Sequence, residues 1–278
     1  MPVSVPVGGL RTPLGGGGPQ LRRLAVYEWG EEDAPRVVLL HGITSHGRHF
    51  ARAAERLAGR FHLLAPDLLG HGSSPWEPPW SIDAHLDAVL ATVGETPAAW
   101  VGHSFGGRLA FELAAREPRL VERLVLIDPA LHLPAEVALF AAERERRDRS
   151  YESFASAIDR RYEESQLHHA ERELVETELR DHLLESADGR WRYRYCQSAV
   201  VAAYSEMTTQ PPPFTAIGVP TLVLLGERSY LPYDHFLDAH RAALGDRLTV
   251  TLVLGGHTVL WDAPEEAVSA IGRYLVEP

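Results

Sequence analysis

The stretch from Trp100 to Ala110, WVGHSFGGRLA, decides the fold of this chain. It joins an apolar run to a helix-like run through a polar Ser104 set among glycines at positions 102, 106 and 107. Glycine weakens both strands and helices, so three glycines here need a backbone reason. Residues 102–106, GHSFG, form a G-x-S-x-G sequence at a strand-to-helix junction. This context predicts a sharp turn, too tight for side chains at 102 and 106, that lifts the Ser104 hydroxyl above the sheet edge.

Strand-like and helix-like runs alternate on both sides of this turn. Short β-branched apolar runs predict strands, and apolar residues three or four apart predict helices. The strand-like runs are 22–30, 36–40, 61–67, 98–104, 120–130, 220–227 and 248–257, and the helix-like runs are 49–59, 81–94, 106–118, 233–245 and 263–277. The alternation predicts an α/β protein with a mostly parallel central sheet flanked by helices.

The alternation is interrupted once. From about His132 to Phe214 the sequence has helix-like stretches and no convincing strand. We therefore expect an α/β core formed by residues 1–132 and 215–278, with a helical cap of residues 133–214 inserted between core strands. Residues 1–20 are rich in Pro and Gly, which predicts a loose tail or an early edge strand.

A serine hydroxyl needs a base to take its proton, and on such a sheet the base follows the last strand. His257 lies there, in the sequence GGH before the final helix. Its ordinary pKa near neutrality suits proton transfer. Two backbone N–H groups are expected to meet the negative charge that develops during attack: that of Phe105 after the serine, and that of Ile43 in the first strand–helix loop.

Together these motifs resemble those of the α/β-hydrolases that carry a cap domain. The matching sequences are HGITS at 41–45, DLLGHGSS at 67–74, GHSFGG at 102–107 and GGH at 255–257. The resemblance covers residues 24–132 and 215–278 and implies the α/β-hydrolase fold with the site at these loops. We expect His41, Asp67 and His71 to shape the loops rather than to react.

The acid that orients His257 is where the chain departs from the family pattern. The family usually places this acid three residues after the glycine that closes the penultimate strand, and here that position holds Ser229. In some members of the family the acid lies instead at the end of the strand that follows the helix after the serine. In this chain Asp128 lies at that place. We expect Asp128 to be the acid, with Glu227 and Asp234 as rivals and a backbone carbonyl as the remaining alternative.

A serine, a histidine and two backbone donors imply acyl transfer through a tetrahedral intermediate and an acyl-enzyme. We expect a serine esterase that hydrolyses a small-to-medium carboxylic ester and needs no cofactor. Aromatic and small apolar residues within 191–207 are candidates to line its acyl pocket. A serine at position 104 argues against epoxide hydrolases and haloalkane dehalogenases, which use Asp there in this family.

Other readings stay open at this point. Relatives with the same three residue types hydrolyse a C–C bond in diketones, and Arg108, Arg192 and Arg194 are candidates to bind a carboxylated substrate of that kind. Lactone, thioester and perhydrolase chemistry also stays open beside the expected ester hydrolysis. A ligand-binding protein without catalysis is the alternative from a different class.

Composition limits the partners. The formal net charge is −11, and no basic cluster is free of nearby acids, which argues against nucleic acid as a partner. No apolar run reaches 18 residues and no signal peptide is recognisable, so we expect a cytoplasmic protein without a membrane span. Cys196 is the single cysteine, so no internal disulfide can form. His168 and His169 lie in a charged helical stretch without further ligands, so no metal site is expected.

Overall fold

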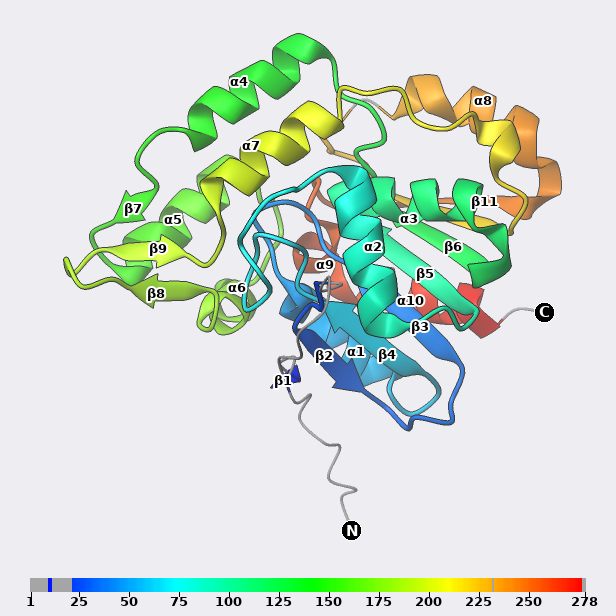
Figure 1. Ribbon diagram of the computed structural model, residues 1–278, viewed down its shortest axis with the longest axis horizontal. Helices are drawn as coiled ribbons and strands as arrows, with labels where there is room; N and C mark the ends of the chain where they lie inside the picture. Colours follow the sequence, from blue (N-terminus) through cyan, green and yellow to red (C-terminus); the bar gives the residue numbers. More distant parts are fainter. Residues whose placement is uncertain (1–9, 12–21, 232, 277–278) are drawn as a thin grey trace.

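The computed structural model describes residues 10–11, 22–231 and 233–276, with the side chains of residues 10, 11, 234 and 235 excepted (Figure 1). The strands are β1 (Leu10–Arg11), β2 (Val26–Trp29), β3 (Arg36–Leu40), β4 (His62–Pro66), β5 (Ala98–His103), β6 (Val121–Ile127), β7 (Ser150–Tyr151), β8 (Leu183–Glu185), β9 (Trp191–Tyr193), β10 (Thr221–Gly226) and β11 (Leu248–Val253). The helices are α1 (Ala51–Leu57), α2 (Ile82–Val93), α3 (Phe105–Arg116), α4 (Ala135–Glu145), α5 (Phe154–Ser165), α6 (Arg172–Leu179), α7 (Gln197–Glu206), α8 (Asp234–Leu244), α9 (Val259–Asp262) and α10 (Pro264–Val276).

Eight strands form the central sheet, in the order β1-β2-β4-β3-β5-β6-β10-β11. The strands from β4 to β11 in this order run parallel, and β2 joins β4 antiparallel. This confirms the α/β fold class that the alternation predicts. The edge strand β1 pairs with β2, whereas the rest of the Pro- and Gly-rich stretch 1–20 lies outside the described residues.

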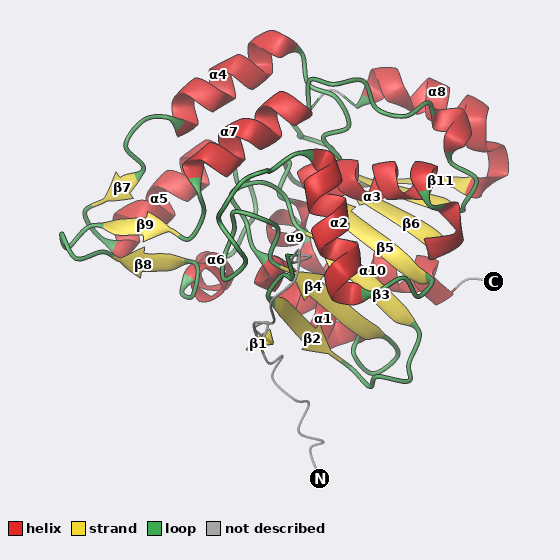
Figure 2. Ribbon diagram, viewed as in Figure 1, coloured by secondary structure: helices red, strands yellow, loops and turns green. Residues whose placement is uncertain are grey.

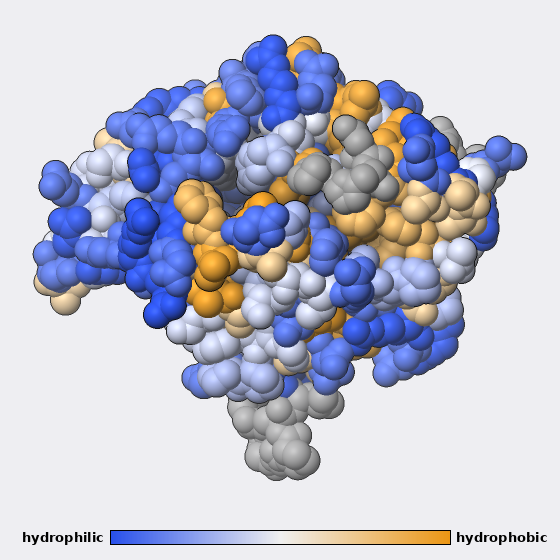
Figure 3. Space-filling model, turned by 90° about the horizontal axis from the view of Figure 1, so that it is seen from above, coloured by the Kyte–Doolittle hydropathy of each residue, from blue (hydrophilic) through white to orange (hydrophobic). Residues whose placement is uncertain are grey.

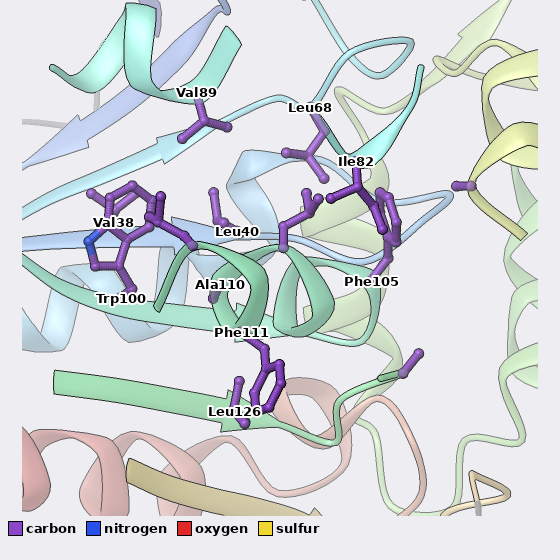
Figure 4. Close-up of a cluster of buried hydrophobic side chains, with 14 of the residues drawn as sticks. Val38, Leu40, Leu68, Ile82, Val89, Trp100, Phe105, Ala110, Phe111 and Leu126 are labelled. Atoms are coloured by element: carbon purple, nitrogen blue, oxygen red, sulfur yellow. The ribbon is translucent and has the colours of Figure 1, made fainter. Parts of the chain in front are cut away.

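Both faces of the sheet are covered, which explains the nearly continuous apolar strands. In β3, Val38 and Leu40 belong to a buried cluster on the side of α2 and α3, while Val37 and Leu39 belong to a cluster on the side of α1 and α10. Figure 4 shows the first cluster, where residues of α2 and α3 meet the strands: Val38, Leu40, Val89, Trp100, Ala110, Phe111 and Leu126. The two clusters fix the sheet between its helices.

The segment between β6 and β10 forms a separate layer above one edge of the sheet (Figure 2). It contains α4, α5, α6 and α7, as the helix-like spacing predicts, and α4 packs on α7. It also contains a three-stranded antiparallel sheet, β7-β9-β8, which the sequence analysis did not anticipate. These strands have two or three residues each, too few for a period-two pattern to be recognised.

The β8–β9 hairpin lies in a part of the chain where the sequence shows helix-like stretches and no convincing strand. The stretch 168–185 reads as one amphipathic helix, but α6 ends at Leu179 and Leu183 begins a strand. The turn after β8 is closed by a hydrogen bond from the Ser186 N–H to the Arg190 carbonyl oxygen (2.8 Å), with Gly189 at a φ of 75°. Pairing with β9 therefore overrides the local helical preference of residues 183–185.

None of the helices within the described part of the chain combines the length and the apolar character needed to cross a bilayer.

Candidate active site

Ser104 occupies the junction between β5 and α3 in a strained backbone conformation, with φ 54° and ψ −118°. A left-handed φ is unfavourable for a residue with a side chain, so the surrounding backbone must enforce it. A Cβ atom at Gly102 would lie 2.2 Å from the Gly106 carbonyl oxygen, and a Cβ atom at Gly106 would lie 2.0 Å from the Leu40 carbonyl oxygen. The glycines thus let β5, α3 and β3 approach closely enough to form the turn.

The parallel sheet brings the loops of the site together. The strands β3, β5, β6, β10 and β11 run parallel, so their carboxyl ends lie at one edge of the sheet. Ser104 follows β5, Asp128 follows β6, and His257 lies in the loop after β11. This edge is where ligands bind in open α/β sheets.

Three side chains form a continuous hydrogen-bonded series at this edge. The Oγ of Ser104 lies 3.0 Å from Nε2 of His257, and Nδ1 of His257 lies 2.5 Å from Oδ2 of Asp128. The exposed fractions are 6 %, 8 % and 2 % for Ser104, His257 and Asp128. Because an ionised carboxylate can only accept, Asp128 favours the tautomer with the proton on Nδ1, which leaves Nε2 free to accept the Ser104 proton.

Ser229, at the position where the family usually has its acid, contacts Asp128 directly. The Ser229 hydroxyl donates to Oδ2 of Asp128 at 2.5 Å, and the Gly226 N–H donates to Oδ1 at 3.3 Å. These donors come from the end of β10, the strand next to β6. Glu227 is exposed, and the side chain of Asp234 lies outside the described residues. Of the acids considered from the sequence, the structure brings Asp128 to His257.

The loop after β3 is held by the three polar residues expected to shape it. Nε2 of His41 accepts from the Leu68 N–H at 2.9 Å, and Nε2 of His71 accepts from the Thr44 N–H at 3.3 Å. Oδ1 of Asp67 accepts from the Gly47 N–H at 2.8 Å. The turn 67–74 therefore supports the loop 41–47.

Ile43, in the middle of this loop, lines the cavity beside Ser104. The Phe105 N–H belongs to the first turn of α3, where helix N–H groups have no partner within the helix. The Phe105 side chain is buried in the core, so only its backbone is a candidate to meet a ligand.

His103 packs against His257, and both line the cavity together with Tyr230. Its ring centroid lies 4.9 Å from that of His257, and its Nε2 lies 3.0 Å from the His257 carbonyl oxygen. Burial, reinforced by the neighbouring His257 and His49, holds the pKa of His103 well below its ordinary value. A neutral His103 adds no second positive charge next to His257. The Tyr230 ring lies 5.0 Å from the His257 ring.

A cavity of about 490 Å³ lies over Ser104 and His257, between the core and the segment 133–214. Its apolar lining includes Val137 and Phe140 of α4, both strongly exposed. In the view from above, hydrophobic surface gathers near the middle of the molecule, beside hydrophilic surface (Figure 3). The lining also contains charged residues: Arg144, Glu145, Arg149, Arg161 and Glu164.

The pocket differs from the sequence expectation in its lining. Of the stretch 191–207, Tyr204 and Met207 reach the cavity among the described lining residues. Trp191, Tyr193 and Tyr195 instead belong to the large buried cluster or pack against it. The helices α4 and α5 supply more of the lining, because the β7-β9-β8 sheet turns the aromatic residues of β9 toward the interior of the inserted segment.

The arginines considered for a carboxylated substrate lie elsewhere. Arg108 is a buried residue of α3 and pairs with Glu112 at 2.8 Å. Arg192 pairs with Asp188 on the surface, and Arg194 donates to the Ser73 hydroxyl. None of the three is among the lining residues of the cavity over Ser104.

Asp262, which the sequence analysis did not single out, joins the inserted segment to the loop of His257. Its Oδ1 accepts from the backbone N–H groups of His168, His169 and Ala170 at 2.9, 2.9 and 3.1 Å, and its Oδ2 accepts from the Gly256 N–H at 2.7 Å. No local pattern marks this residue, because its three partners in the inserted segment lie more than 90 residues away.

Within the described residues, no cluster of three or more His, Cys, Asp or Glu side chains has an arrangement able to hold a metal ion. The side chains of His168 and His169 are exposed, and their backbone N–H groups donate to Asp262.

Comparison with known proteins identifies a family. Residues 37–271 match the profile described as the Alpha/beta hydrolase family. The chain is 34 % identical over 262 residues to Lipase LipV of Mycobacterium tuberculosis, covering 91 % of this chain and 97 % of that protein. It is 30 % identical over 261 residues to the sn-1-specific diacylglycerol lipase ABHD11 of Mus musculus, covering 88 % and 82 % of the two chains.

Solved structures agree on the fold. The crystal structure of E-2-(acetamidomethylene)succinate hydrolase superposes with a TM-score of 0.79 at 25 % identity, over 91 % of this chain and 95 % of that one. The thioesterase domain from the curacin biosynthetic pathway superposes with a TM-score of 0.75 at 22 % identity, over 97 % and 99 % of the two chains.

Proposed function

The chain belongs to the alpha/beta hydrolase family, and from that premise we propose that it is a serine esterase that cleaves carboxylic esters. In this proposal Ser104 is the nucleophile, His257 is the general base and acid, and Asp128 orients His257. The single observation that supports it most is the series Ser104–His257–Asp128, with donor–acceptor distances of 3.0 and 2.5 Å, at the base of a cavity.

The chemistry follows from these contacts. As the Ser104 Oγ attacks the ester carbonyl carbon, Nε2 of His257 takes the hydroxyl proton, and the Asp128 carboxylate stabilises the imidazolium that forms. When the tetrahedral intermediate collapses, the C–O bond to the alcohol breaks and His257 returns the proton to the departing alcohol. Water, deprotonated by His257, then attacks the acyl-enzyme and releases the carboxylic acid and Ser104.

We assign the oxyanion hole to the backbone N–H groups of Ile43 and Phe105. The carbonyl oxygen becomes negative in each tetrahedral intermediate, and preorganised donors in a site shielded from water stabilise that charge strongly. The Phe105 N–H adds the positive end of the α3 dipole. The loop of Ile43 is held by His41, Asp67 and His71, so its donor is fixed before substrate binds.

We also propose that residues 133–214 act as a cap that shapes the substrate pocket. The cavity is bounded by α4 and α5 on one side and by the loops of Ser104 and His257 on the other. Its apolar mouth suits the hydrocarbon part of an ester. The two relatives compared above, which each cover most of this chain, are named lipases, and this supports an ester substrate over the C–C bond of a diketone.

The test is a series of p-nitrophenyl esters, from acetate to dodecanoate, with the wild type and Ser104→Ala. We expect wild-type turnover and a fall of at least about 10³-fold in Ser104→Ala, because the nucleophile is removed. The acyl chain length that gives the highest turnover indicates the size of the acyl pocket. A fluorophosphonate should label Ser104 in the wild type alone. Labelling without turnover on any ester would contradict the ester assignment, and absence of labelling would favour a protein that only binds its ligand.

A further inference from the structure

Arg161, on α5, carries a charge that its surroundings do not neutralise. It is half-buried and lines the cavity over Ser104. Its Nη1 and Nη2 lie 3.3 and 3.4 Å from Oγ1 and the carbonyl oxygen of Thr44, and its Nε lies 3.3 Å from the Tyr193 hydroxyl. These are long contacts to neutral groups. The guanidinium carbon also lies 4.4 Å from the centroid of the Tyr193 ring, a cation–π contact that supplies no counterion. Among the described residues, no carboxylate oxygen comes within 4.0 Å of its guanidinium nitrogens.

The other arginines of the cavity have acidic partners. Arg149 makes two hydrogen bonds with the Glu164 carboxylate, at 2.7 and 2.5 Å, and Arg144 lies 3.5 Å from Glu145. Burial by itself would raise the pKa of Glu164. The hydrogen bonds and the charge of Arg149 outweigh burial and lower this pKa to about 2, so the carboxylate is ionised. Three guanidinium groups therefore share two carboxylates, and positive charge is in excess inside a protein of net charge −11.

An unpaired guanidinium in a shielded cavity is costly, because its charge loses solvation without gaining a counterion. An anionic ligand would supply that counterion, and guanidinium groups suit carboxylates through paired N–H donors. Arg161 also contacts Thr44, the residue after the Ile43 whose N–H we assign to the oxyanion hole. A group bound by Arg161 would thus lie in the same cavity as the reacting ester.

We propose that Arg161 selects esters that carry a second, anionic group, and that the natural substrate bears a carboxylate in addition to the scissile ester. The inference rests on the proposed esterase function and adds a substrate class to it. The apolar residues on the α4 side hold the hydrocarbon part, and Arg161 holds the charged end.

The experiment compares ester pairs that differ in charge alone. Monomethyl esters of the dicarboxylates from succinate to suberate carry the charge on the acyl side, and methyl esters of the monocarboxylates of equal chain length are their neutral partners. Carboxymethyl hexanoate and ethyl hexanoate form a pair with the charge on the alcohol side. Each is assayed with the wild type, Arg161→Gln, Arg161→Lys and Arg192→Gln.

We expect the wild type to prefer the anionic member of at least one pair, and Arg161→Gln to lose about 10- to 100-fold in kcat/KM on that member, mainly through KM, while its neutral partner is nearly unaffected. Arg161→Lys should keep part of the preference for the anionic ester, since lysine retains the positive charge but lacks the paired N–H donors of the guanidinium group. Arg192→Gln is the control: it removes an equal charge from the same segment, at an exposed site paired with Asp188 outside the cavity.

An equal loss on both members would mean that Arg161 only fastens α5 to the Thr44 loop, and the inference would be wrong while the esterase assignment stands. Binding is measured separately, by calorimetry of the same pairs on Ser104→Ala and on Ser104→Ala/Arg161→Gln. If the wild type cleaves no ester, tighter binding of the anionic members that depends on Arg161 still supports the inference, and equal binding overturns it.

Discussion

At the scale of single residues, Asp128, which we propose as the acid of the site, lies next to the position where the family pattern expects that acid. Ser229 stands where the family pattern expects the acid, and its hydroxyl donates to Asp128 at 2.5 Å. Asp128 follows β6, the strand next to β10, and Ser229 after β10 supplies a hydrogen-bond donor to it instead of a carboxylate. Ser229 contacts the same Oδ2 atom of Asp128 that lies next to Nδ1 of His257, so the two positions are neighbours beside the imidazole.

This arrangement predicts a rescue. We expect Asp128→Ala to lower ester turnover by about 10³- to 10⁴-fold, because His257 loses the group that sets its tautomer and stabilises its positive charge. The double variant Asp128→Ser/Ser229→Asp should recover part of that loss. Ester kinetics measure the turnover of each variant, and circular dichroism checks that each variant folds. Glu227→Gln is the control and should change little. Near-normal turnover in Asp128→Ala would instead direct attention to Glu227.

A second prediction concerns the glycine that permits the turn. In Gly106→Ala the new Cβ would lie 2.0 Å from the Leu40 carbonyl oxygen, so β3 and α3 must separate. We expect a loss of several kcal/mol in the free energy of unfolding. Gly59→Ala is the matched control, because nothing lies within 4 Å of its added Cβ and its φ is not left-handed. Urea denaturation measures both, and equal midpoints would refute this account of the turn.

At the scale of elements, Asp262 couples the inserted segment to the loop of His257. One carboxylate accepts three N–H groups from residues 168–170, just before α6, and one from Gly256. A carboxylate with four donors is fully satisfied although it is buried. The position of the segment over the cavity and the position of His257 therefore depend on the same side chain.

We expect Asp262→Asn to lower kcat about 10-fold and to speed amide hydrogen exchange in residues 166–172 and 254–259. The amide nitrogen of Asn cannot accept, so some of the four backbone donors lose their partner. Exchange measured by mass spectrometry, together with ester kinetics, tests both effects. Glu265→Gln serves as the control, since Glu265 pairs with Arg52 and Arg56 on the surface. Unchanged exchange in residues 166–172 would show that other contacts hold the segment.

At the scale of the whole molecule, buried histidines make the stability depend on pH. Burial lowers the pKa of His71 and of His240 to about 4 and that of His85 to about 3, and it holds the pKa values of His41 and His182 well below the ordinary value. These values lie below the unfolded value of about 6.5, so the unfolded chain takes up protons first as the pH falls. Stability is thus lost between pH 6.5 and the folded-state pKa values.

We expect the free energy of unfolding to fall steeply from pH 7 to pH 5, with each group such as His240 contributing on the order of 1 kcal/mol at pH 5.5. Burial raises the pKa of Asp67, which offsets part of the loss at still lower pH. Urea denaturation across this range measures the slope. His240→Phe, whose ring would lie among Phe111 and Phe214, should reduce the slope, whereas the exposed control His169→Gln should not. A flat profile would contradict buried neutral histidines.

The sequence by itself determined the features that are local or periodic. Apolar runs alternating with helical spacing specify the parallel sheet, since each strand must be apolar on both faces. The glycines around Ser104 specify the turn, because they alone permit its backbone geometry. Ser104 and His257 could be expected to meet, since loops after parallel strands share one edge.

The tertiary structure decided what depends on which elements become neighbours. Asp128 meets His257 because β6 lies between β5 and β10 in a sheet whose order differs from the order along the chain. The pairing of β8 with β9 turned a helix-like stretch into a strand. Asp262 and Arg161 gained their places by contacts with residues about 90 and 117 positions away, and no local pattern records such distances. The physical reason is that burial and charge pairing act between segments that only the folded chain brings together.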